Sequence, residues 1–169
     1  GQGVYVPGFS GASTTEVVHV QAPTAVIAGE QAYAVRADAD LTLGGLLTIG
    51  TGTGGVGGLI LNNANVQGAG SLNFGQAEGV VLAGVDPTIS VDVAGTGGVT
   101  KSGDAELVLS NPGVLSFTGG LQVNRGGVKL ASGTTLNPGN GLVVWRYVVD
   151  ADQHLDPEIT TTIVAEKTT

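Results

Sequence analysis

Four carboxylate residues lie between residues 150 and 158, at a spacing that suits a metal site with oxygen ligands. Asp150, Asp152 and Asp156 alternate with other residues, and Glu158 follows them. Ca²⁺ takes several carboxylate oxygens from alternating positions of a short loop. The segment departs from the standard calcium loop, because His154 stands at its fifth position and no glycine follows at the sixth. The residues therefore form a candidate calcium site, and a solvated acidic turn is the alternative interpretation.

Catalytic side chains are sparse. The two histidines, His19 and His154, lie far apart in the chain, and no GxSxG motif is present to place a nucleophilic serine on a sharp turn. Enzymes that cleave polysaccharides need carboxylates that converge on one groove. The candidate acids of this chain are scattered along the sequence, and they also suit a solvent-facing role. These acids are Asp86, Asp92, Asp104 and Glu106. We expect a protein without enzymatic activity and without a cofactor.

Composition excludes several classes of partner. The chain has six basic and fourteen acidic residues, and the resulting net charge of −8 disfavours contact with nucleic acid and with anionic lipid. Cysteine is absent, which removes disulfides and thiolate chemistry. No run of 18 apolar residues occurs, so we expect no membrane insertion. The glycine-rich segment TGTGGVGG at 51–58 is not followed by lysine, and we interpret it as a turn rather than a phosphate loop.

Glycine-punctuated apolar runs recur at nearly even intervals. They begin at Gly58, Gly79, Gly98, Gly120 and Gly141, so successive starts lie roughly 20 residues apart. A period of that size is typical of one coil of a solenoid, and such a coil must stack on a neighbour to bury its apolar face. Aromatic residues make up only 4% of the chain, which suits thin layers of aliphatic side chains.

Apolar and polar residues alternate within these runs, which is typical of strands buried on one face. The sequence predicts an all-β β-solenoid over 41–141, with an N-terminal arm or cap at 1–40 and a C-terminal cap or interface segment at 142–169. Candidate strands inside the arm cover 16–20, 25–28 and 33–36. An antiparallel β-sandwich remains the alternative fold. The side chains expected to face inward are Leu59, Leu61, Val80, Leu82, Leu107, Leu109, Leu121 and Val123.

The segment 97–133 resembles the autotransporter-associated β-strand repeat, also called the passenger-associated transport repeat. Ala105, Leu115 and Gly127 depart from the repeat's usual glycine, asparagine and threonine. The residues that match its first half are Gly98, Thr100, Lys101, Gly103, Leu107 and Leu109, and those that match its second half are Phe117, Gly119, Val123, Asn124 and Gly126.

This resemblance implies a right-handed parallel β-helix whose motif residues are architectural and carry no chemistry. It also implies a bacterial protein, extracellular or displayed on the cell surface, with a structural or adhesive role. The alternative is a subunit of an extracellular assembly, such as a virion decoration, tail or fibre protein of a phage, or a surface layer.

The end segments differ in character from the repeats. The strand-like stretches at 142–150 and 159–165 hold the only tryptophan and several β-branched residues. Because the terminal coils of a solenoid expose unpaired strand edges, such segments serve as caps or as strands that contact another subunit. We predict a homo-oligomer or larger assembly with interface residues Trp145, Tyr147, Ile159 and Ile163.

Overall fold

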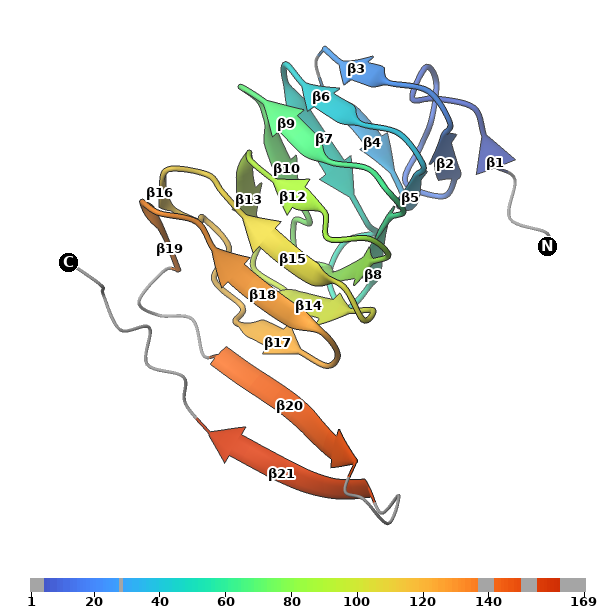
Figure 1. Ribbon diagram of the computed structural model, residues 1–169. Helices are drawn as coiled ribbons and strands as arrows, with labels where there is room; N and C mark the ends of the chain where they lie inside the picture. Colours follow the sequence, from blue (N-terminus) through green and yellow to red (C-terminus); the bar gives the residue numbers. More distant parts are fainter. Residues whose placement is uncertain (1–4, 28, 137–141, 150–154, 162–169) are drawn as a thin grey trace.

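The computed structural model describes residues 5–27, 29–136, 142–149 and 155–161. These residues form strands and turns without any helix, wound into a β-solenoid of about six turns (Figure 1). The described chain is therefore all-β, with parallel sheets, as the sequence predicts.

Nine strands form the longest sheet, which we call sheet A. Its order follows the chain, because each coil adds one strand beside the strand of the previous coil. The strands are, in order, β1 (Tyr5–Val6), β2 (Val17–Val20), β5 (Ala34–Ala37), β8 (Val56–Leu61), β11 (Glu78–Ala83), β14 (Val99–Ser102), β17 (Leu121–Val123), β20 (Leu142–Val149) and β21 (Leu155–Thr161).

Two further sheets complete the walls of the solenoid. Sheet B contains β3 (Thr24–Val26), β6 (Leu41–Leu43), β9 (Val66–Gly68), β12 (Thr88–Ile89), β15 (Glu106–Leu109) and β18 (Gly127–Leu130). Sheet C contains β4 (Glu30–Ala32), β7 (Leu46–Ile49), β10 (Ser71–Asn73) and β13 (Asp92–Ala94), and the last two coils replace it with the pair β16 (Gly113–Val114) and β19 (Thr134–Thr135).

Strand register gives the length of each coil. Partners on sheet A are Val17 with Ala34, Ala34 with Gly58, Gly58 with Val80, and Val80 with Thr100. The residue numbers of these partners show that, of the four coils they define, the first is the shortest and the second is the longest. The period of roughly 20 residues expected from the sequence is confirmed, although the coil length varies more than the even glycine spacing indicates.

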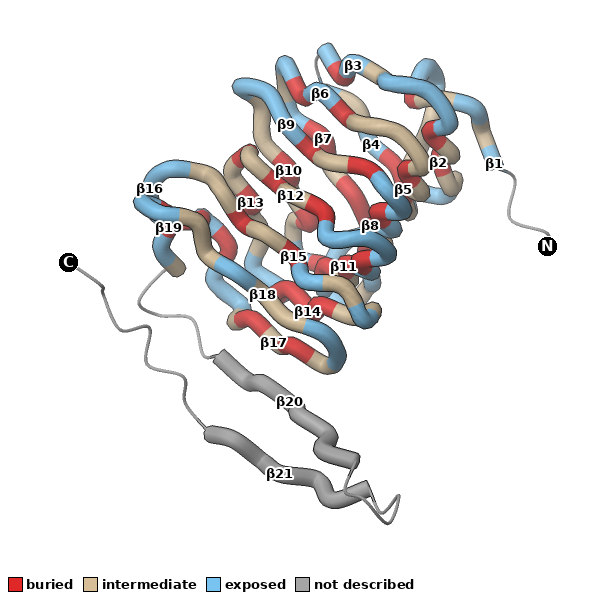
Figure 2. The backbone as a smooth tube through the Cα atoms, in the orientation of Figure 1, coloured by how far each residue is buried: buried red, intermediate tan, exposed pale blue. Residues whose placement is uncertain are grey.

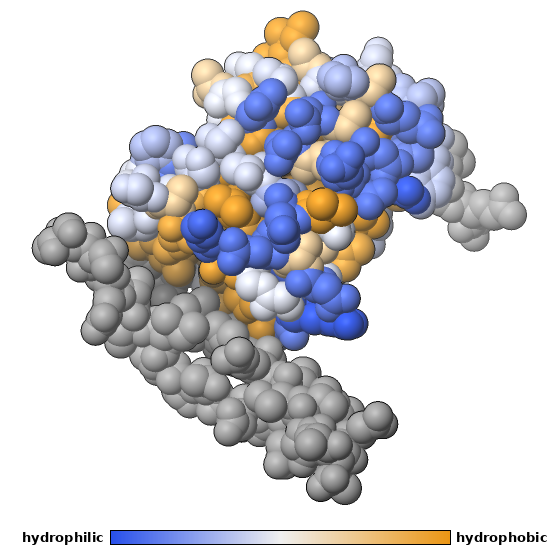
Figure 3. Space-filling view, viewed as in Figure 1, coloured by the Kyte–Doolittle hydropathy of each residue, from blue (hydrophilic) through white to orange (hydrophobic). Residues whose placement is uncertain are grey.

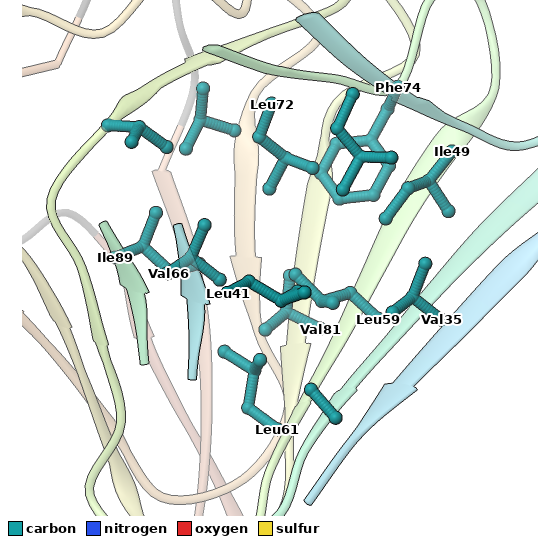
Figure 4. Packing of buried hydrophobic residues seen from close by; sticks show 14 of the residues in the cluster. Val35, Leu41, Ile49, Leu59, Leu61, Val66, Leu72, Phe74, Val81 and Ile89 are labelled. Atoms are coloured by element: carbon teal, nitrogen blue, oxygen red, sulfur yellow. The ribbon is translucent and has the colours of Figure 1, made fainter. Parts of the chain in front are cut away.

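Side chains alternate between the interior and the surface along most strands, and Figure 2 shows this as repeated short buried bands. The interior is filled by stacked aliphatic residues from all three walls, including Leu59 of sheet A, Leu41 and Ile89 of sheet B and Leu72 of sheet C (Figure 4). Burying one such side chain contributes about 1.5–3 kcal/mol. Because each coil supplies only a few, the stack gains its stability from contacts between successive coils.

Two of the eight predicted core residues are wrong. Val80 is half-buried and Leu82 is 40% exposed, whereas Val81 and Ala83 face inward. The reason is Phe74, whose ring occupies the interior beside Gly79. A Cβ atom built on Gly79 would lie only 2.4 Å from that ring. Glycine therefore takes an inward position of β11, and the regular alternation continues from it through Val81 and Ala83, in register with Leu59 and Leu61 of β8.

The solenoid begins within the segment expected to be an N-terminal arm. β2, β3 and β5 match the three candidate strands of that segment, and β5 pairs in parallel with β8. The residues before β2 cover the first coil, because β1 extends sheet A and the side chain of Phe9, 5% exposed, joins the core. The chain's own residues therefore cover part of this end, while β3 and β4 remain the outermost described strands of sheets B and C.

Every described strand pair is parallel except one, so the antiparallel sandwich is excluded. The exception is β20 with β21 at the C-terminal end, where Trp145 is the partner of Ile159. β20 also continues the parallel stack, because Leu142 pairs with Leu121 of β17. The parallel solenoid therefore ends in an antiparallel hairpin.

Candidate functional site

The predicted interface and calcium residues fall on this hairpin or outside the described residues. Trp145 and Tyr147 lie on β20, and Ile159 lies on β21. Asp156 and Glu158 also lie on β21, in backbone register with Val148 and Arg146, so this part of the expected acidic turn is strand. The remaining predicted residues, Asp150, Asp152 and Ile163, lie outside the described residues, as does His154. Within the described ranges, no cluster of three or more His, Cys, Asp or Glu side chains could hold a metal ion.

Two of the four scattered acids, Asp86 and Asp92, bond to the backbone of the next coil, and Asp104 pairs with the side chain of Arg125. Asp86 accepts a hydrogen bond from the backbone N–H of Glu106 at 2.9 Å, and Asp92 accepts one from Ser116 at 3.0 Å. Asp40 accepts one from Asn65 at 2.8 Å. Such bonds tie successive coils together where the ladder is interrupted at a corner. Asp92 lies on sheet C, away from the corner between sheets A and B that Asp86 and Glu106 share, so the four acids do not converge.

Lys101 lies at an inward position of β14. Its register partners are Val81 on one side and Val123 on the other, both buried, and Lys101 itself is 0% exposed. A buried ammonium requires hydrogen-bond acceptors for its three donors. Lys101 lies near the C-terminal end of β14, next to the turns that lead to sheet B.

Three carbonyl oxygens meet those donors. Nζ of Lys101 donates to the backbone oxygens of Gly103 and Ala105, both at 2.5 Å, and of Arg125 at 2.9 Å. Burial lowers the pKa of Lys101 below its usual 10.5, and the charges of Asp104 and Asp86 oppose that shift. All three donors are used within the fold, so Lys101 joins two consecutive turns and is not available as a catalytic base.

A second polar cluster lies at the N-terminal corner between sheets A and B. Asp38, which follows β5, contacts side chains of three coils. Its Oδ2 lies 2.6 Å from Nε2 of His19, and its Oδ1 accepts from Nε of Arg36 and Nδ2 of Asn62, both at 3.1 Å. The ring of Tyr5 meets the His19 ring edge-on, with centroids 5.8 Å apart. Four polar side chains therefore meet at this corner.

Hydrogen bonding fixes the charge of this cluster. The bond from His19, followed by those from Asn62 and Arg36, lowers the pKa of Asp38 from 3.8 to about 2. Asp38 therefore stays ionised throughout the physiological range. The His19 and Asp38 side chains are only partly exposed, at 22% and 25%. The imidazole is thus held in one orientation by a permanent negative charge.

This shift predicts an acid-dependent loss of stability. Because the folded pKa of Asp38 is below its unfolded value, the contribution is complete above about pH 4 and declines as the pH falls towards 2. The difference in unfolding free energy between the wild type and Asp38→Asn should therefore shrink across that window. Urea unfolding at a series of pH values measures it, and a constant difference from pH 6 to pH 2 would contradict the assignment.

The sequence does not reveal this cluster, because its members are separated by roughly one coil. His19 and Arg36 are register partners on adjacent strands, and Asp38 and Asn62 follow partnered strands. The coil length is the only signal in the sequence that would place these residues side by side, and it is irregular in this part of the chain. Lys101 carried a clearer signal, since it follows Val99 by two residues and so takes the inward side of the strand.

Comparison of the chain with protein-family models, with curated proteins and with solved structures finds no match in any of the three. Within the described residues, the structure contains no helix long and apolar enough to cross a membrane. The fold and the two corner clusters are therefore the basis on which a function is assigned.

Proposed function

We infer that the protein is a non-enzymatic structural scaffold with an adhesive role, built as a stack of β-coils. The observation that carries this proposal is that polar side chains of the protein bond to the backbone of the stack. Lys101, Asp40, Asp86 and Asp92 all bond to backbone groups of the same or a neighbouring coil. These residues hold the stack together, as the architectural residues of a display scaffold do.

The surface of the stack suits display. On the face shown in Figure 3, hydrophilic groups lie among apolar ones rather than around a single apolar patch. Together with the resemblance of 97–133 to passenger repeats and the lack of cysteine, this supports a location outside the cell or on the surface of a bacterium. A virion is the alternative location.

Adhesion without turnover tests this function. Beads coated with the protein should adhere to surfaces that carry bacterial polysaccharide, and the bound material should be recovered chemically unchanged. Beads coated with an unfolded variant should not adhere. Cleavage products that accumulate in proportion to time and protein concentration would contradict the proposal, as would equal adhesion of folded and unfolded protein.

The C-terminal end favours a second candidate, a subunit of a larger assembly. Among the described strands, β21 is the outermost of sheet A and β18 the outermost of sheet B. The inward residues Val128, Leu130 and Leu136 are only partly buried, although Leu107 and Leu109, the register partners of Val128 and Leu130, are buried. Open strand edges beside incompletely covered apolar residues are sites where another chain adds a strand.

Deletion of residues 157–169 separates the two candidates. If these residues make contacts between subunits, the truncated protein should have a lower molar mass by light scattering and an unchanged strand signal by circular dichroism. The reason is that the β1–β19 stack supplies its own core. Loss of the strand signal from a truncated monomer would show instead that the segment caps its own chain.

A further inference from the structure

A recess lies beside the His19 cluster, at the N-terminal end of sheet A. Its walls are Pro7 and Gly8 from the segment after β1, together with the end of β2 and the turn into β3, from His19 to Thr24. Its volume is about 210 Å³. Sites for drug-sized ligands begin at about 300 Å³. The recess is smaller than that and suits a single small ring.

The recess exists because β1 ends early. β1 pairs with β2 only through Tyr5 and Val6, and the next residue, Pro7, has no N–H to continue the ladder. On β2 the carbonyl of Val20 accepts from Asp38 on the β5 side. Because successive residues of a strand direct their backbone groups to opposite sides, the backbone groups of His19 and Gln21 face the side that β1 has left.

Polar groups at this edge are available for a ligand. Within the described part of the chain, Gln21 makes no hydrogen bond through its backbone or its side-chain amide. His19 donates through Nε2 to Asp38 when neutral, which leaves Nδ1 as an acceptor. The Thr24 hydroxyl donates to the carbonyl of Ala22 at 2.8 Å and keeps an acceptor lone pair. The recess therefore presents neutral donors and acceptors together.

The charges around the recess disfavour an anionic ligand. Among the described residues, no lysine or arginine lines it, and the nearby Arg36 is paired with Asp38 at 3.1 Å. The net charge of −8 further disfavours an anion. Two apolar rings lie at the edge of the site: Pro7 in its wall and Tyr5, 59% exposed, against His19. Hydroxyl-binding groups beside apolar rings fit a sugar, whose ring has polar edges and C–H faces.

We propose that this recess binds one neutral sugar residue, with Gln21 and His19 contacting its hydroxyl groups. The proposal rests on the adhesive function inferred above and names its ligand class. His19 is oriented in advance by Asp38, which is itself held by Arg36 and Asn62. A fixed polar group loses less entropy on binding than a mobile one.

Nuclear magnetic resonance titration with D-glucose, D-galactose and D-mannose tests the proposal, with D-glucuronate as the charged comparison. At least one neutral sugar should shift the amide signals of Gly8, His19 and Gln21 with a Kd of roughly 1 mM, as expected for a small ligand. Gln21→Ala should weaken binding about tenfold or more, corresponding to about 1.4 kcal/mol. Gln31→Ala is the matched control, because Gln31 is an exposed glutamine on sheet C.

Three results would overturn the proposal: no signal shifts at about 50 mM of any neutral sugar, equal affinity of the wild type and Gln21→Ala, or tighter binding of D-glucuronate. His19→Ala provides a second variant, checked for folding by circular dichroism. The adhesion test measures binding by the whole folded protein rather than by this site alone. If the beads adhere but free sugars do not bind, the proposed sugar site is wrong and the adhesive scaffold function stands. If the beads do not adhere, the adhesive function itself is wrong.

Discussion

Replacing Leu109 by aspartate should unfold the stack. Leu109 lies on β15, 3% exposed, in register with Ile89 of the previous coil and Leu130 of the next. An unpaired carboxylate in this thin apolar layer costs several kcal/mol, a large part of the roughly 5–15 kcal/mol that stabilises a typical domain. We expect most of the strand signal in circular dichroism to be lost at about 25 °C.

Val108→Asp is the matched control. Val108 is adjacent on the same strand but points to the surface, where its register partners are Thr88 and Lys129. Val108 is half-buried, so a carboxylate there reaches solvent and lies beside a cation, and stability should fall by about 1 kcal/mol or less. Equal effects of the two substitutions would contradict the placement of Leu109 in the core.

Replacing Lys101 by methionine should lower the unfolding free energy by about 3 kcal/mol. Methionine fills similar space but cannot donate to the carbonyls of Gly103, Ala105 and Arg125. Each buried carbonyl left without a donor costs about 1–3 kcal/mol, and the relief from burying an ammonium offsets part of the total. Urea unfolding measures the difference.

Lys129→Met provides the control for this substitution, since Lys129 is exposed on β18. Its removal should leave the unfolding midpoint nearly unchanged. If Lys101→Met were as stable as Lys129→Met, the three carbonyls would be satisfied in another way, and the role of Lys101 in joining two turns would be wrong.

The general architecture could be predicted from the sequence because the repeats obey simple rules. Period-2 alternation located Leu59, Leu107, Leu109 and Leu121 in the interior, and glycine spacing gave the approximate coil length. The expectation is wrong only at Val80 and Leu82, where the alternation is regular but its inward positions are Gly79, Val81 and Ala83. There a glycine occupies an inward position to make room for Phe74, and no local pattern reveals a contact of that kind.

The N-terminal cluster could not be predicted for a related reason. His19 and Asp38 meet because the first coil, from Val17 to its partner Ala34, is shorter than the period of the repeats. A sequence pattern shows spacing along the chain but not which positions of neighbouring coils become partners. Recognising the recess also required the structure, because it depends on the point where β1 leaves β2.

Distances between labels on successive coils test the scaffold most directly. The chain has no native cysteine, so spin labels can be placed at Thr42 together with Ser90, Ser110 or Ala131, which lie on or directly after strands stacked on sheet B. Dipolar spectroscopy should give narrow distributions at about 10, about 14 and about 19 Å, increasing by about 4.8 Å per coil. Broad distributions, or distances that do not increase evenly with coil number, would contradict a rigid parallel stack.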